Sequence, residues 1–217
     1  LHTCTYLETN GEAELVFLNI LPNGHVDLLD LEEKLAGSDQ KTLVTLMQAN
    51  NEIGNITDIM KVGDLCAQYQ AIFHADTVQT VGHFPIDLST TQVDFITGAA
   101  HKFHGPKGVG MLYINGKNKI HPLIHGGGQE RNMRAGTENI YGIIGFAKAL
   151  EIATAHHEKE KEQILGIKKY FKHKLTAEIP GIVFNGDPDG ESLYTVLSAG
   201  FPQNDKTEML LFNLDIR

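Results

Sequence analysis

The alternation of apolar and polar stretches along the chain predicts strands and helices that follow one another. Short apolar runs typical of buried strands occupy residues 42–47, 71–74, 93–97 and 109–114, and a further strand is predicted over 14–20. Helical spacing of apolar residues spans 27–36, and a second helix begins near Thr57 or Asp58 and runs to about residue 70. Strands that alternate with helices predict an α/β fold with a largely parallel sheet.

The pattern changes after Asn139, where apolar residues recur at helical spacing to about residue 175. Because a long helix often separates two domains, we expect a large domain over residues 1–178, incomplete at its N-terminus. Residues 179–217 then form part of a smaller C-terminal domain, with strands at 182–184 and 193–197 and a helix at 208–214.

Composition narrows the classes of function. The 217 residues contain 18 Lys and Arg against 27 Asp and Glu, and the resulting charge of −9 argues against a surface for nucleic acid or an anionic membrane. No apolar run approaches the roughly 18 residues needed to span a bilayer, and the first residues lack the features of a signal peptide. Two cysteines outside any CxxC pair suit a reducing, cytoplasmic environment.

Polar residues follow three of the predicted strands. In an open parallel sheet, ligands bind beyond the carboxyl ends of the strands. Asn50, Asn51 and Glu52 follow the strand at 42–47, Asp76 and Gln79 follow the strand at 71–74, and residues 97–102 follow the third. We expect one rim of the sheet to carry an amide, an acid and a lysine.

The lysine on this rim has a distinctive setting. Lys102 follows a buried strand through small residues and precedes the glycine-rich turn GPKG at 105–108. A lysine on such a turn can be desolvated, which favours the neutral amine that bonds to carbonyl carbon. Paired with Asp76, it supplies what pyridoxal phosphate chemistry requires, an amine for the aldehyde and a carboxylate for the pyridine nitrogen.

At these residues the chain resembles the cysteine desulfurases, which are pyridoxal phosphate enzymes of the class V aminotransferase group. The motifs that carry the resemblance are NNEIG (50–54), HADTVQ (74–79), DFITGAAHK (94–102) with GPKG (105–108), GGGQER (126–131) and RAGTEN (134–139). The unbroken NNEIG resembles the branch that serves iron–sulfur assembly. The resemblance implies the large domain of a fold type I enzyme, a mostly parallel mixed sheet with helices on both faces, plus part of a small α+β domain.

The resemblance also implies the role of each site residue. Lys102 would bond to the cofactor and later move protons at the substrate Cα, and Asp76 would pair with the pyridine nitrogen. Gln79 and Asn51 would approach the phenolic oxygen. The phosphate would be held by the following groups: His101, the backbone near Ala99, and Thr137 of a second subunit in a homodimer.

Four departures from the family pattern stand out. Ala99 occupies the place of a phosphate-binding serine, so one hydroxyl contact is missing. A ring-stacking histidine is expected just before Leu1. The catalytic cysteine and the arginine that binds the substrate carboxylate are expected beyond Arg217, which indicates an internal piece of a longer enzyme. Neither Cys4 nor Cys66 is in the nucleophile's position, and Cys66 is interpreted as a small core thiol.

The expected reaction removes sulfur from L-cysteine to give L-alanine and an enzyme persulfide, which passes to an iron–sulfur scaffold or another sulfur acceptor. A selenocysteine lyase or another class V enzyme is the alternative. Pairs such as His101 and His104 leave a metal-dependent hydrolase as a remote alternative, although no closed set of metal ligands appears and no metal is expected. A catalytically inactive scaffold is the non-enzymatic alternative.

Overall fold

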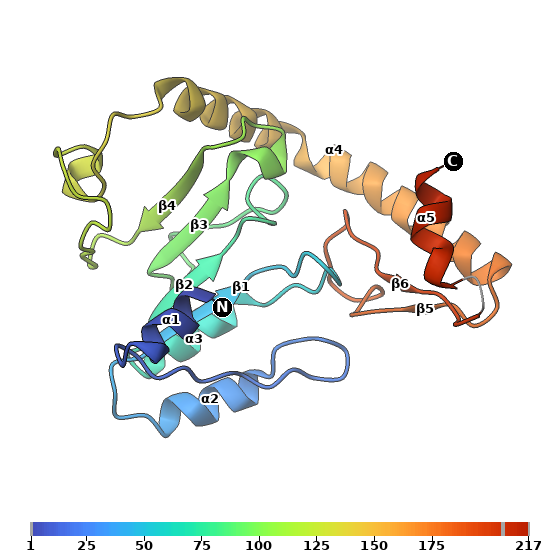
Figure 1. Ribbon diagram of the computed structural model, residues 1–217, viewed down its shortest axis with the longest axis horizontal. Helices are drawn as coiled ribbons and strands as arrows, with labels where there is room; N and C mark the ends of the chain where they lie inside the picture. The colour runs from blue at the N-terminus through green and yellow to red at the C-terminus, as the bar shows by residue number, and fades with distance from the viewer. Residues whose placement is uncertain (1, 205–206, 217) are drawn as a thin grey trace.

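The computed structural model describes residues 2–204 and 207–216 (Figure 1). The helices are α1 (His2–Thr9), α2 (Leu28–Ala36), α3 (Ile59–Gln68), α4 (Ile140–Glu178) and α5 (Leu210–Asp215), with short 3-10 helices η1 (Ala100–Phe103), η2 (Glu130–Asn132) and η3 (Thr207–Met209). The strands are β1 (Leu43–Met47), β2 (Ile72–Asp76), β3 (Phe95–Ala99), β4 (Gly110–Ile114), β5 (Val183–Phe184) and β6 (Ala199–Gly200).

A four-stranded sheet in the order β1-β2-β3-β4 forms the centre of the fold. The first three strands are parallel, and β4 returns antiparallel to β3. In this register Met47 lies beside Asp76, and Asp76 beside Thr97, so three strands end at one rim. The structure confirms an α/β fold with a mixed, mostly parallel sheet.

The main core lies between one face of this sheet and helices α2 and α3. Alternate strand residues such as Phe73 and Ile96 are buried on this face against Leu31 of α2 and Val62 of α3. This alternation is what the pleat of a strand with one packed face requires. The opposite face carries exposed side chains, which include Leu43, Met47 and Leu112.

Both helices on the packed face begin at an aspartate cap. The Asp58 carboxylate accepts hydrogen bonds from the Met60 and Lys61 N–H groups, which selects Asp58 over Thr57 as the start of α3. Asp27 caps α2 in the same way. The apolar spacing over 27–36 also placed Leu29 on the packed side of α2, and this detail is wrong, because Leu29 points to solvent with 73% of its surface exposed.

The predicted strand at 14–20 is wrong. The structure has only an isolated bridge there, between Ile20 and Val26, while Phe17 is exposed. Asn19 instead bonds to a side chain: its N–H and its amide donate to the two carboxylate oxygens of Asp30, at 2.8 and 2.9 Å. A strand needs a neighbouring strand's backbone, and here a carboxylate supplies the partner. Pattern analysis also missed α1.

The long helix α4 leads from the sheet to a second group of elements (Figure 1), where β5 and β6 form a two-stranded antiparallel sheet. The predicted strand at 193–197 is wrong. Its residues form a turn and an irregular segment, because the Leu193 N–H bonds to the Gly54 carbonyl at 2.8 Å rather than to a strand. The strand that pairs with β5 comes two residues later. The helix predicted at 208–214 is confirmed as η3 and α5.

A helix that crosses a membrane must be both long enough and apolar enough. None of the helices in residues 2–204 and 207–216 meets both conditions.

Candidate functional site

The carboxyl ends of β1, β2 and β3 bring the expected polar residues to one rim. Asp76 is the last residue of β2, and its carbonyl accepts the Gln48 N–H at 2.8 Å from the segment that leaves β1. The chain leaving β3 turns at once into η1, which bears His101 and Lys102. The rim therefore brings together Asp76, Gln79, Ala99, His101 and Lys102 from two consecutive strand ends.

Hydrogen bonds hold the loop after β2 to the neighbouring segments at β1 and at β3. On the β3 side, the Thr77 hydroxyl donates to the Thr97 carbonyl at 2.7 Å. On the β1 side, the buried Thr80 hydroxyl donates to Gln48 Oε1 at 2.6 Å. Because Gln79 lies between these two anchors, its backbone position is set by hydrogen bonds and not by its own side chain.

The turn that carries Lys102 is tightly packed on the side of α4, whereas its lysine side chain is exposed to solvent. The Gly105 N–H donates to the Ala100 carbonyl at 2.8 Å, and a Cβ on Gly105 would stand only 2.9 Å from that oxygen. Phe103 is 1% exposed and packs edge-on against Phe146 of α4 at 5.2 Å between ring centroids. The neighbouring Lys102 side chain is exposed. Packing of Phe103 thus holds the turn in place, while the Lys102 side chain points to solvent.

Several polar groups on this rim keep hydrogen-bonding capacity to spare. Asp76 Oδ1 accepts the Val78 N–H at 3.0 Å, and the other carboxylate oxygen has no partner within the described part of the chain. Across those same residues, the side chains of Gln79, His101 and Lys102 also make no hydrogen bond or ion pair. Such a set of acid, amide, imidazole and amine is available to a ligand.

His74 lies two residues before Asp76, on the same face of β2. Its Nδ1 lies 2.7 Å from the Thr45 hydroxyl and its Nε2 lies 3.3 Å from the Thr97 hydroxyl. Burial lowers the pKa of His74, and the charge of Asp76 opposes this shift only in part. The ring is therefore held between two hydroxyls beside the carboxylate. The HxD spacing of His74 and Asp76 within a strand predicts that the two side chains lie on one face.

Asn51 and Thr137 lie on exposed loops. The Asn51 amide donates to Glu52 Oε1 at 3.0 Å, in a turn that follows β1. Thr137 has no hydrogen bond to the rim residues among those the structure describes, and the cap of α4 is Asn139, whose side chain accepts the Gly142 N–H at 3.1 Å. Asn139 and not Thr137 therefore caps α4, and the predicted role of Thr137 toward a second subunit stays a prediction.

The loop before α4 has an unusual backbone. Glu130, Arg131 and Asn132 all have positive φ, at 46°, 56° and 65°. Left-handed conformations cost free energy for residues other than glycine. Gln129 Oε1 accepts the Gly136 N–H at 3.1 Å and ties the two ends of this turn together. The structure thus fixes the shape of the segment between the GGGQER and RAGTEN motifs.

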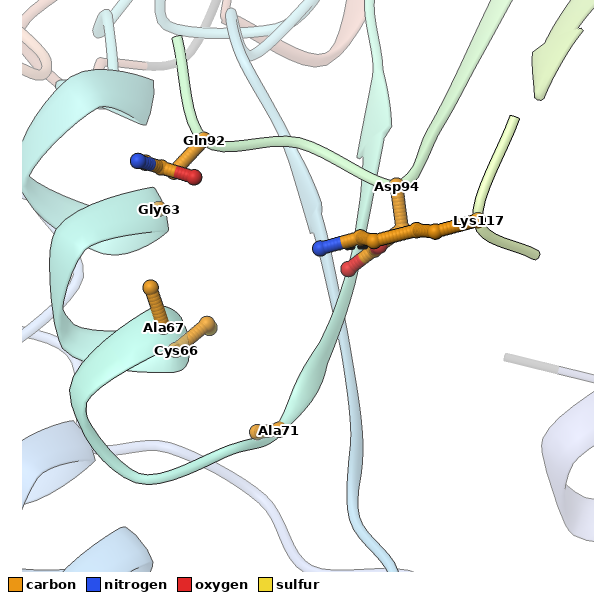
Figure 2. Close-up of a pocket in the computed structure, with 7 residues that line it drawn as sticks. All are labelled: Gly63, Cys66, Ala67, Ala71, Gln92, Asp94 and Lys117. Carbon is orange, nitrogen blue, oxygen red and sulfur yellow. Dashed lines mark ion pairs between the residues drawn. The ribbon is translucent and has the colours of Figure 1, made fainter. Parts of the chain in front are cut away.

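A small pocket lies elsewhere, between α3 and the segment that enters β3 (Figure 2). Its volume is about 20 Å³, and Cys66 on one wall faces Asp94 and Lys117 on the other (Figure 2). Cys66 is 1% exposed, and burial, followed by the charge of Asp94, raises its thiol pKa to about 12. The pocket has room for little more than a water molecule, and its thiol is protonated at neutral pH.

Comparison with known proteins identifies the family. The sequence profile of Aminotransferase class-V matches residues 1–215. The chain belongs to the class-V aminotransferases. Class-V relatives include cysteine desulfurase IscS of Dictyoglomus turgidum, 42% identical over 216 residues, and putative cysteine desulfurase IscS 1 of Bacillus subtilis, 38% identical over 216 residues. Both alignments cover 100% of this chain but 54% and 56% of the relatives, so the chain spans about half their length.

Solved structures agree with this class-V assignment. A NifS-like protein superposes with a TM-score of 0.90 at 34% identity, over 99% of this chain and 58% of the other. A NifS-like protein from Rickettsia africae superposes with a TM-score of 0.89 at 32% identity, over 99% and 59%. These findings confirm the expected family and favour it over the metal-dependent hydrolase.

Proposed function

We propose that this class-V chain binds pyridoxal phosphate at the rim where β2 and β3 end. The observation that carries the proposal is the register that pairs Asp76, the last residue of β2, with Thr97 of β3, just before the turn that presents the free Lys102 amine. The donor set fits the cofactor, because its aldehyde needs an amine, its pyridine nitrogen needs an acid, and its phenolic oxygen and phosphate need polar donors. Among the described residues, the side chains of Gln79, His101 and Lys102 make no hydrogen bond or ion pair, and Asp76 keeps one carboxylate oxygen free.

Each rim residue receives one part of the cofactor in this proposal. Asp76 holds the pyridine nitrogen, because an anion beside it favours the protonated form. Gln79 donates to the phenolic oxygen, with Asn51 nearby. The phosphate is held by His101, by backbone near Ala99, and by Thr137 from a second copy of the chain, which makes the active unit a homodimer.

The proposed reaction is the desulfuration of L-cysteine. Bound cofactor would act as an electron sink for the substrate Cα. Lys102 takes the Cα proton and returns a proton as L-alanine forms. The substrate C–S bond breaks and its sulfur passes to an enzyme thiolate, so that L-cysteine and an enzyme thiol become L-alanine and an enzyme persulfide.

The nucleophilic thiolate must move between substrate and acceptor, which requires an exposed loop. Cys66 fails on this requirement, because it is buried within α3 with a pKa raised to about 12. Cys4 lies in α1, a regular helix. We therefore place the nucleophile on a cysteine outside this chain.

The proposal extends to the partner, the compartment and the domains of the protein. We propose an iron–sulfur scaffold or another sulfur acceptor as partner, because a cysteine desulfurase, as these relatives are named, must pass its sulfur to an acceptor. The two free cysteines support a reducing cytoplasm. The separate sheet formed by β5 and β6 supports a division into residues 1–178 and 179–217. Selenocysteine lyase activity remains the alternative reaction.

The test uses the full-length protein that contains this chain. With pyridoxal phosphate bound, it should release alanine and sulfide from L-cysteine in the presence of a thiol reductant, and borohydride should label Lys102 in the peptide map. A label on Lys107 in place of Lys102 would contradict the assignment. Selenocysteine as the better substrate would select the alternative.

A second experiment tests the shared site. Mixed dimers of a Lys102→Ala subunit and a Thr137→Ala subunit contain one site with both defects and one intact site if Thr137 acts across the dimer. Such mixtures should recover activity that neither parent shows. Activity no higher than that of the parents would assign Thr137 to its own subunit.

A further inference from the structure

His83 connects the lysine turn to a segment far along the chain. It lies in the loop after β2, with Nε2 at 2.9 Å from the Lys102 carbonyl oxygen and Nδ1 at 2.9 Å from the Tyr194 hydroxyl. The two rings meet edge-on at 5.8 Å, and Tyr194 is 2% exposed. The sequence analysis assigned neither residue a role.

The acceptor at one end fixes the direction of these hydrogen bonds. A carbonyl oxygen can only accept, so His83 Nε2 carries the hydrogen that it donates to Lys102. In the neutral ring Nδ1 then has a lone pair, and the Tyr194 hydroxyl donates to it. Tyr194 thereby favours the tautomer that holds the lysine turn.

The Lys102 carbonyl needs this donor because no backbone N–H in the described part of the chain donates to it. It stands near the end of η1, where carbonyl groups lose their helical partners. The N–H groups of His104 and Gly105, which follow in the chain, both bond to the Ala100 carbonyl. The His83 ring thus satisfies a carbonyl that the fold leaves exposed to competition from water.

Tyr194 is itself held by contacts of the two residues that precede it, Ser192 and Leu193. The Leu193 N–H donates to the Gly54 carbonyl at 2.8 Å, on the loop that carries Asn51. From α4, Lys168 Nζ donates to the Leu193 carbonyl at 2.8 Å and to the Ser192 hydroxyl at 2.9 Å. The segment 192–194 therefore contacts the Asn51 loop and, through His83, the Lys102 turn.

We propose that His83 is a positioning residue that orients the Lys102 turn, and that the Tyr194 hydroxyl sets the required tautomer. The proposal rests on the proposed function in one respect, since it takes Lys102 as the lysine that bonds to pyridoxal phosphate. It adds two residues to the site and gives the segment 192–194 a part in holding that lysine.

Substitution of His83 by glutamine or by asparagine distinguishes the effects of its two hydrogen bonds. A glutamine amide can reach the place of Nε2 and donate to Lys102, whereas an asparagine amide reaches only the place of Nδ1. In the full-length holoenzyme, we expect kcat of His83→Asn to lie about 3–10-fold below that of His83→Gln, with KM for L-cysteine within about twofold. Reconstitution of the apoprotein with pyridoxal phosphate should show the same order in the rate of covalent attachment at Lys102.

Tyr194→Phe removes only the hydroxyl and should lower both rates about 2–5-fold, as expected for one neutral hydrogen bond. Tyr69→Phe is the matched control, because its hydroxyl donates to Glu32 Oε1 at 3.4 Å away from the rim. Thermal unfolding of each variant shows whether it folds.

Equal rates in folded His83→Asn and His83→Gln would overturn the proposal. If either variant fails to fold, Tyr194→Phe decides: a rate equal to that of Tyr69→Phe overturns it. Parent protein that attaches cofactor at Lys102 but releases no sulfide would refute only the proposed reaction, and the attachment rates would still test His83. Failure of the parent to attach cofactor at Lys102 would overturn both proposals.

Discussion

An aspartate and a lysine lie near each end of the paired strands β2 and β3, and the two pairs differ in what surrounds them. At the carboxyl ends, Asp76 and Lys102 keep free hydrogen-bonding groups. At the opposite ends, Asp94 accepts the Phe73 N–H at 2.8 Å and the Asn118 amide at 2.6 Å, and it pairs with Lys117 at 3.1 Å.

The electrostatics of Asp94 follow from these partners. Burial raises its pKa, but the hydrogen bond from Phe73 and the contacts with Asn118 and Lys117 outweigh burial and lower it below the usual range. Every partner comes from the chain itself, so this aspartate stabilises the fold. An aspartate and a lysine can therefore form a binding site only where the chain leaves their hydrogen-bonding groups unpaired, so that a ligand can bind to them.

The largest expected effect is at Lys102. Lys102→Ala should abolish covalent attachment of pyridoxal phosphate and lower desulfuration by three orders of magnitude or more, on the order expected when a covalent catalyst is removed. Borohydride reduction with peptide mapping and a sulfide assay measure both. Lys107→Ala, on the same glycine-rich turn, is the matched control, and an equal loss in the control would contradict the assignment.

Asp76→Asn should lower desulfuration on the order of 100-fold or more, because a neutral amide does not stabilise a charged pyridine ring. Thermal stability should change little, since the amide oxygen can still accept the Val78 N–H. Turnover and the melting temperature measured on one preparation separate the two effects. Near-normal turnover would remove Asp76 from the proposed chemistry.

Asp94→Ala should show the reverse pattern. Loss of the carboxylate leaves the Phe73 N–H unpaired at a buried site, which costs about 1–3 kcal/mol of unfolding free energy. Because the folded-state pKa is lowered, the parent protein holds this stabilisation above the ordinary aspartate pKa and loses it as pH falls through the folded value. Urea unfolding at neutral and acidic pH measures it, with exposed Asp64→Ala as control. If Asp94→Ala is as stable as Asp64→Ala, Asp94 does not stabilise the fold as proposed.

The last prediction concerns the chemical reactivity of Cys66, which lies beside Asp94 and contributes to neither site. With a thiol pKa near 12 and 1% exposure, Cys66 should react with iodoacetamide at pH 8 at least about 100-fold more slowly than the partly exposed Cys4. Mass spectrometry of alkylated peptides gives both rates. Comparable labelling of the two cysteines in folded protein would show that the pocket opens.

The sequence predicted the sheet well because short apolar runs bounded by polar residues mark buried strands. The run at 93–97 placed β3 two residues early, at Val93 rather than Phe95. Val93 is 3% exposed and belongs to the core, but the ladder with β2 begins only after Asp94, whose side chain bonds to Phe73. Burial and strand pairing therefore have different boundaries, and an apolar run reports only burial.

The rim residues were predictable for the same reason, since strand order and parallel direction bring strand ends together. The link from His83 to Tyr194 was not predictable. It joins residues 111 positions apart in the chain, and Tyr194 lies within a segment that the pattern predicted as a strand. The segment 193–197 looked like a strand because its residues are apolar, whereas Leu193 and Tyr194 are buried by contacts with a loop and a histidine.

The contact of Leu193 with Gly54 also has a consequence for folding during synthesis. The two residues are separated by most of the chain, and closing so long a loop is entropically costly and slow. A ribosome adding about 5–20 residues per second would release the Lys102 turn several seconds before Tyr194 emerges. During that interval the sheet can form, but His83, which bonds to the Lys102 carbonyl, does not yet have the Tyr194 hydroxyl as a partner. The order of translation therefore delays completion of the site until the late segment has docked.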